Sequence, residues 1–97
     1  MTQIYAVQIK GGSNNDKYLV KYHKGYDTSD EIGLQNMFHL RESAVKAAEG
    51  YIKECEYGQK RLNEDKEMSY VTTEYYRKLA LQGRSYVVKT FNLVEVK

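Results

Sequence analysis

The sequence contains no proline and no tryptophan, and Cys55 is its one cysteine. A lone thiol excludes an internal disulfide and has no second thiol with which to build a zinc or redox motif. No apolar run approaches the roughly 20 residues that a membrane-crossing helix needs. The formal net charge of +2, from 15 basic and 13 acidic residues, is too close to balance to indicate a nucleic-acid binder or an acidic mimic of DNA.

The length of 97 residues predicts a single domain over residues 1–97 with little room for a deep, walled active site. The first ten residues, MTQIYAVQIK, have no basic segment followed by an apolar one, and they alternate like a strand instead of a signal peptide. We therefore expect a cytoplasmic protein.

Alternating apolar side chains predict two strands at the start of the chain. Residues 3–10 have the period of two that a strand requires, glycine and asparagine follow at 11–16, and the alternation resumes from Lys17. These segments predict an antiparallel hairpin. Residues 24–36 contain two glycines and several turn formers and are expected to be a loop, with a short strand or turn at Met37 and Phe38.

Between Leu40 and Leu62 the sequence repeats every seven residues. A glutamate precedes a lysine by four residues three times, an order worth roughly 0.2–0.5 kcal/mol per exposed pair in a helix. The pairs are Glu42–Lys46, Glu49–Lys53 and Glu56–Lys60, and the apolar residues beside them are Val45, Ala48, Ile52, Cys55 and Leu62. We expect a helix from Arg41 to about Asn63, with the charges as its solvated face and Cys55 in the core. A coiled-coil dimer through Val45, Ala48 and Ile52 is a weaker alternative.

The last third of the chain predicts a second helix and a closing strand. Apolar residues recur at helical spacing over 72–82, with Thr72 or Thr73 as N-cap and Gly83 as the glycine after the helix. Residues 70–76 also favour a strand, so that alternative stays open. Residues 85–96 are rich in β-branched and aromatic side chains, with both faces apolar, which indicates burial of both faces or a bulge near Asn92. The predicted fold is α+β, a small antiparallel sheet of order β-β-α-α-β with one helical layer on one face.

No motif predicts catalysis. His23 and His39 have no companion residue at zinc spacing, and the glycines form no phosphate-binding string. Ser43 and Lys46 match the S-x-x-K string of serine β-lactam hydrolases, but those enzymes need further motifs and a larger scaffold. The sequence predicts a non-enzymatic protein with no catalytic residue, no cofactor and no metal.

Ten tyrosines in 97 residues are more than a small core needs. Tyrosine and arginine are enriched at binding hot spots, which favours protein recognition or homodimerisation. The predicted protein-binding residues are Tyr70, Tyr75, Tyr76, Arg77, Arg84 and Tyr86.

A nucleic-acid-binding or regulatory module is the alternative. Basic residues that hold phosphates alternate with tyrosines that stack bases along the first hairpin. The residues are Lys17, Tyr18, Lys21, Tyr22, Lys24 and Tyr26. The same pattern is also typical of an edge strand that resists aggregation.

The chain combines an opening hairpin, the helix entry Phe-x-Leu-Arg-Glu-x-Ala from Phe38 to Ala44, and a closing strand that ends in Val-Glu-Val-Lys at 94–97. This layout resembles small accessory proteins of phages and mobile elements of Gram-positive bacteria. The resemblance implies a monomer or homodimer in the bacterial host's cytoplasm that inhibits or redirects a host protein or protein–nucleic-acid complex, as anti-CRISPR proteins do. It assigns no functional residue to this chain, and the near-neutral charge departs from the acidic DNA-mimic type.

Overall fold

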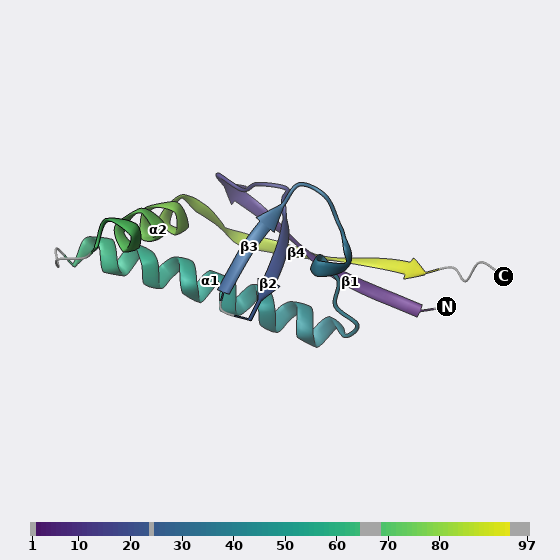
Figure 1. The fold of residues 1–97 in the computed structure, drawn as a ribbon. Coiled ribbons are helices and arrows are strands. Elements are labelled where there is room, and N and C mark those ends of the chain that lie inside the picture. The colour runs from purple at the N-terminus through teal and green to yellow at the C-terminus, as the bar shows by residue number, and fades with distance from the viewer. Residues whose placement is uncertain (1, 24, 65–68, 94–97) are drawn as a thin grey trace.

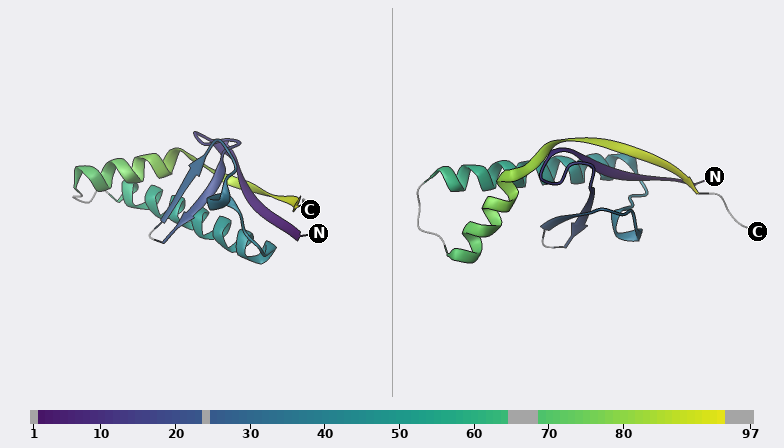
Figure 2. Two further views of the ribbon diagram at one scale, coloured as in Figure 1. Left: turned by 45° about the vertical axis from the view of Figure 1, so that its right-hand side comes forward. Right: turned by 90° about the horizontal axis from the view of Figure 1, so that it is seen from above.

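The computed structural model describes residues 2–23, 25–64 and 69–93. The elements are β1 (Thr2–Gly12), β2 (Tyr18–Tyr22), β3 (Gly25–Ser29), a 3₁₀ turn (Leu34–Asn36), α1 (Arg41–Asn63), α2 (Tyr70–Leu81) and β4 (Gln82–Leu93). The four strands form an antiparallel sheet in the order β3-β2-β1-β4 (Figure 1). Helix α1 packs against the sheet, and α2 returns beside its C-terminal half (Figure 2). The predicted α+β fold is confirmed.

β3 corrects the predicted order, because residues 25–29 were expected to be a loop. The segment Gly-Tyr-Asp-Thr-Ser contains glycine and aspartate, which are depleted in strands, but it pairs antiparallel with β2 along its whole length, from Tyr18–Ser29 to Tyr22–Gly25. The buried Asn36 side chain supports this hairpin by donating to the carbonyl of Leu19 at 3.2 Å. At the predicted turn, Phe38 pairs with Tyr5 of β1.

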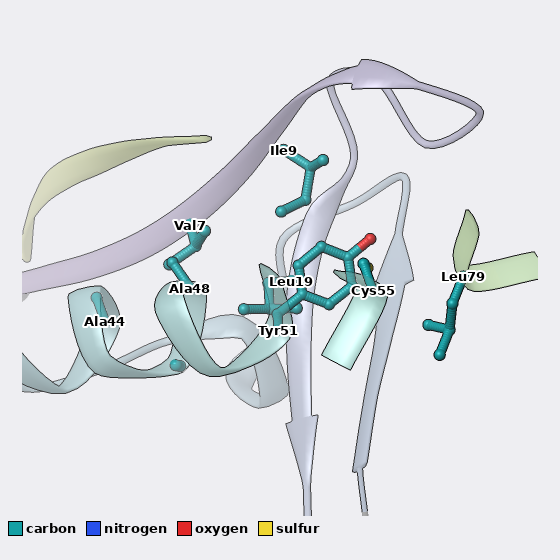
Figure 3. Packing of buried hydrophobic residues seen from close by; sticks show 9 residues of the cluster. Val7, Ile9, Leu19, Ala44, Ala48, Tyr51, Cys55 and Leu79 are labelled. Carbon is teal, nitrogen blue, oxygen red and sulfur yellow. The ribbon is translucent and has the colours of Figure 1, made fainter. Parts of the chain in front are cut away.

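Helix α1 has the predicted bounds and supplies most of the core. The side chains of Ala44, Ala47, Ala48, Tyr51 and Cys55 are buried against β1, β2 and Leu79 of α2 (Figure 3). Three alanines on this face bring the helix backbone close to the sheet.

The buried stripe of α1 is offset from the predicted one. All six paired Glu and Lys residues are exposed as predicted, whereas Val45, Ile52 and Leu62 are only half-buried. Ala48 is completely buried inside the domain, so it is not available for the alternative of a coiled-coil dimer through Val45, Ala48 and Ile52.

Residues 70–81 are helical, so the alternative of a strand is wrong. The cap is Ser69, whose hydroxyl accepts from the Thr72 amide at 3.2 Å, and not Thr72 or Thr73. The chain leaves α2 directly into β4, because Gln82 already has extended backbone angles.

Gly83 lies within β4 and does not close α2. A side chain at Gly83 would overlap the backbone carbonyls of Lys10 and Gly11, where β4 meets the end of β1. Glycine is required there because two backbones approach each other closely.

β4 has no bulge near Asn92. Its register with β1 is continuous from Thr2–Leu93 to Lys10–Ser85, and the irregularity falls between Lys10 and Gly12. The predicted strand end at Val96, and residues 94–97 of the resemblance, lie outside the described residues.

A buried hydrogen-bond network joins the hairpin turn, α1 and β4. The Asn14 amide donates to the Tyr51 hydroxyl at 2.5 Å, and that hydroxyl donates to the Gln82 side-chain oxygen. The Asn14 oxygen accepts from the Gly83 amide at 3.0 Å. These bonds satisfy polar groups that would be costly to bury unpaired.

Candidate protein-binding surface

Three tyrosine rings form a row across the two helices. The rings of Tyr57 on α1 and Tyr76 on α2 meet edge to face with centroids 5.9 Å apart, and the ring centroids of Tyr75 and Tyr76 are 5.7 Å apart. Tyr57 is 52% exposed and Tyr76 is half-buried. The row therefore joins two exposed rings, Tyr57 and Tyr75, to a half-buried ring, Tyr76.

Gly58 is the residue that lets α2 approach α1 at this row. A Cβ at position 58 would lie only 3.2 Å from Leu79 and 3.3 Å from Tyr76, tighter than ordinary side-chain contacts. Leu79 is buried in the core cluster and fixes this part of α2. The position of the tyrosine row thus follows from a glycine on one helix and a leucine on the other.

The first turn of α2 carries two further exposed side chains. Tyr70 is 79% exposed and Val71 is 76% exposed, and Val71 shares a helix face with Tyr75 four residues later. We call the set Tyr57, Tyr70, Val71, Tyr75 and Tyr76 the tyrosine surface.

Three charged groups near the tyrosine surface, Glu54, Glu74 and Arg77, have hydrogen-bond partners. The Tyr75 hydroxyl donates to a carboxylate oxygen of Glu54 at 2.9 Å. Burial, and then Glu54, raise the pKa of Tyr75 to about 12, so this hydroxyl remains protonated at neutral pH. Arg77 pairs with Glu74 at 2.7 Å one turn away.

The structure divides the six predicted protein-binding residues. Tyr70, Tyr75 and Tyr76 lie on the tyrosine surface, and the exposed Arg77 lies on the same helix. Arg84 instead donates to the backbone carbonyls of Gln82 at 2.6 Å, Leu79 at 3.1 Å and Cys55 at 3.3 Å, so it holds the end of α2 onto α1.

Tyr86 is half-buried on β4 and packs against the core cluster. Sequence reasoning also missed Tyr57 and Val71. Tyr57 stands among charged residues in the sequence, and only the return of α2 makes it part of an aromatic row.

The predicted nucleic-acid-binding residues do not form one surface. In β2, Tyr18 and Tyr22 fall on the face opposite to Lys21, because side chains alternate along a strand. Tyr26 of β3 is the cross-strand partner of Lys21. Its ring packs edge to face on Tyr51, with ring centroids 5.9 Å apart. Burial raises the pKa of Tyr26.

Acidic residues also lie among these lysines. Lys17 is 3.5 Å from Asp30, and Lys24 lies outside the described residues. The hairpin therefore has mixed charge instead of the continuous basic track that phosphates favour.

The described residues contain no group of three or more histidine, cysteine, aspartate or glutamate side chains that could hold a metal ion. Ser43 and Lys46 are both exposed on α1, in an open hollow whose described lining comes from that helix alone. Cys55 is buried, and burial raises the pKa of its thiol, which makes it a poor nucleophile. No helix among the described residues is long and apolar enough to cross a membrane.

Comparison of the chain with protein-family models, with characterised proteins and with solved structures finds no match.

Proposed function

We propose that this chain is a non-enzymatic binding protein that engages a partner protein through the tyrosine surface. The observation that carries the proposal is the row of Tyr57, Tyr76 and Tyr75, with the exposed Tyr70 and Val71 on the first turn of the same helix α2. Large amphipathic rings on a surface bury much apolar area on binding and offer hydroxyl groups to a partner, which is why tyrosine is enriched at interfaces.

The packing and hydrogen bonding beneath the tyrosine surface support the same proposal. Gly58 and Leu79 pack the two helices together, and the Tyr75 hydroxyl is already bonded to Glu54. Because the side chains of Tyr75 and Tyr76 are held in place before a partner arrives, their binding loses less side-chain entropy.

The specific form of the proposal follows the resemblance to phage accessory proteins. The partner would be a host protein or protein–nucleic-acid complex, and the chain would inhibit it by covering a surface or holding one conformation, as an anti-CRISPR protein does. Mixed charge around the tyrosine surface, with Glu74 paired to Arg77, favours contact with protein over contact with bare nucleic acid.

The first test is affinity capture from a Gram-positive host lysate, with and without nuclease, using three forms of the tagged chain. The double variant Tyr70→Ala with Val71→Ala removes the two most exposed side chains of the surface. Lys17→Ala with Lys21→Ala is the matched control on the hairpin. We expect a discrete protein that resists nuclease, binds the control, and binds the tyrosine variant at least about 10-fold more weakly.

The opposite pattern would contradict the proposal. A partner that is lost with nuclease, and lost with the lysine variant but not the tyrosine variant, would assign the chain to nucleic acid.

The anti-CRISPR form has its own test. Purified chain is added to guide-RNA-loaded nuclease before target DNA, and cleavage is followed over time. Inhibition by the natural chain that the double variant Tyr70→Ala with Val71→Ala loses would support this form. Unchanged cleavage at saturating protein would exclude the nuclease tested as the target.

A further inference from the structure

β4 forms an open edge of the sheet. β1 is its neighbour on one side, and no described strand pairs with the other side. β4 and β1 run side by side toward the chain ends (Figures 1 and 2). An edge of this kind presents unpaired amides and carbonyls that can pair with another strand.

The hydrogen bonds of β1 identify which backbone groups of β4 are free. The amide and carbonyl of Tyr5 bond to Phe38 at 2.9 and 2.8 Å, and those of Ile9 bond to Lys17 and Asp16 at 2.9 and 2.8 Å. Both residues therefore direct their backbone polar groups away from β4. Because bonding alternates along an antiparallel pair, the residues opposite them direct theirs to the open edge. The residues opposite Tyr5 and Ile9 are Thr90 and Tyr86. The same alternation adds Val88 between them and Asn92 beyond them.

The other edge of the sheet is better protected than β4. β3 has only five residues, and the Asp27 carboxylate accepts from the Thr28 amide at 2.8 Å. Residues 85–92 of β4 contain a single charge, Lys89, and neither a proline nor a bulge. Charges, prolines and bulges are the usual means by which edge strands avoid pairing.

We propose that β4 pairs antiparallel with β4 of a second copy of this chain, with the two-fold axis at Val88. In this register Val88 lies opposite Val88 of the second copy, and Tyr86 lies opposite Thr90, so these three residues supply donors and acceptors on both sides. Asn92 lies opposite Arg84. An aromatic residue opposite a β-branched one is a favourable cross-strand pair.

The charge of Lys89 selects this register over its neighbour. An axis at Lys89 would place two ammonium groups directly opposite each other, which is destabilising. With the axis at Val88, the aliphatic stem of Lys89 lies across from Val87, which is 41% exposed in the single chain. An axis at Val87 would move the strand of the second copy toward α2. Because α2 joins β4 without a loop, this shift brings the second strand closer to the helix.

Disulfide trapping tests the register. In the double variant Val87→Cys with Lys89→Cys, the thiol introduced at position 87 lies opposite the thiol introduced at position 89 of the second copy. Such non-hydrogen-bonded pairs have Cα atoms about 4.5 Å apart, within disulfide range. Both positions are exposed and Cys55 is buried, so we expect a covalent dimer under mild oxidation with little effect on folding. The single variant Val87→Cys keeps Lys89 and should stay monomeric on a non-reducing gel, and efficient cross-linking by this variant would overturn this register.

The mass in solution tests the dimer itself. We expect twice the chain mass of 11.3 kDa by light scattering. Thr90→Pro removes an amide that points to the open edge and leaves the bonds to β1, so it should give a folded monomer, while Thr90→Ala should remain dimeric. A natural chain that is monomeric at every concentration overturns the proposal, as does a dimer that persists in folded Thr90→Pro. If circular dichroism shows that Thr90→Pro is unfolded, the cysteine pair decides.

Discussion

Replacing Tyr51 with phenylalanine removes a single buried oxygen from the centre of the fold. The ring remains, so its packing against Val7, Ile9 and Leu19 in the core cluster is retained (Figure 3). The loss falls on Asn14, which donates to the hydroxyl at 2.5 Å, and on the Gln82 oxygen, which accepts from it.

The expected loss in the free energy of unfolding is about 2 kcal/mol. A buried polar group left without its partner costs roughly 1–3 kcal/mol, and two groups are affected here. Part of this cost is recovered, because the Gln82 oxygen also accepts from the Cys55 thiol at 3.9 Å and Asn14 can shift toward Gln82 across the vacated position. For a domain of this size, a loss of about 2 kcal/mol lowers the melting temperature by roughly 8–16 °C.

Urea unfolding followed by far-ultraviolet circular dichroism measures this loss directly. Tyr22→Phe is the matched control, because Tyr22 is 54% exposed on β2. We expect the control to change stability by less than about 0.5 kcal/mol. A Tyr51→Phe protein as stable as the control would refute the claim that this network stabilises the junction of turn, helix and β4.

Three further predictions use the same unfolding assay. Gly83→Ala should lower stability by about 1–3 kcal/mol because its Cβ overlaps the Lys10 and Gly11 carbonyls; Gly25→Ala, with no atom within 4 Å of its Cβ, is the control, and equal stability would contradict the close approach. Ser69→Ala should cost about 1 kcal/mol by removing the α2 cap, whereas Ser69→Asp should retain most of it, and equal losses would argue against capping. Burial raises the pKa of Tyr51 and Tyr75 above the ordinary 10.0, so the folded state favours the neutral phenols. The contribution of these two groups to the free energy of unfolding should be constant below pH 10 and fall as the pH rises toward 12. In Tyr51→Phe the fall should be less steep.

Local signals identified the elements whose own side chains determine them. The seven-residue repeat predicted the bounds of α1, and alternating apolar residues predicted the first hairpin and the last strand. By contrast, β3 depends on its neighbour β2. Its segment Gly-Tyr-Asp-Thr-Ser does not alternate in polarity like a strand, and it becomes extended by pairing with β2. Gly83 was assigned to the end of a helix because the approach of β1 to β4, far apart in sequence, leaves no local mark.

The candidate site divides in the same way. Sequence reasoning selected the tyrosines of α2 because their residue type is common at interfaces, and it also selected Arg84, whose binding partners prove to be backbone carbonyls of this chain. Tyr57 could not be found, because its aromatic neighbours come from another helix.

The sequence by itself determined the class of the fold and the bounds of its long helix, since periodicity and charge spacing act within a few turns of chain. Only the tertiary structure decided which tyrosines share a surface and which edge of the sheet stays open. Both depend on the return of α2 and β4 over residues distant in sequence, with Gly58 and Gly83 supplying the room for close contact.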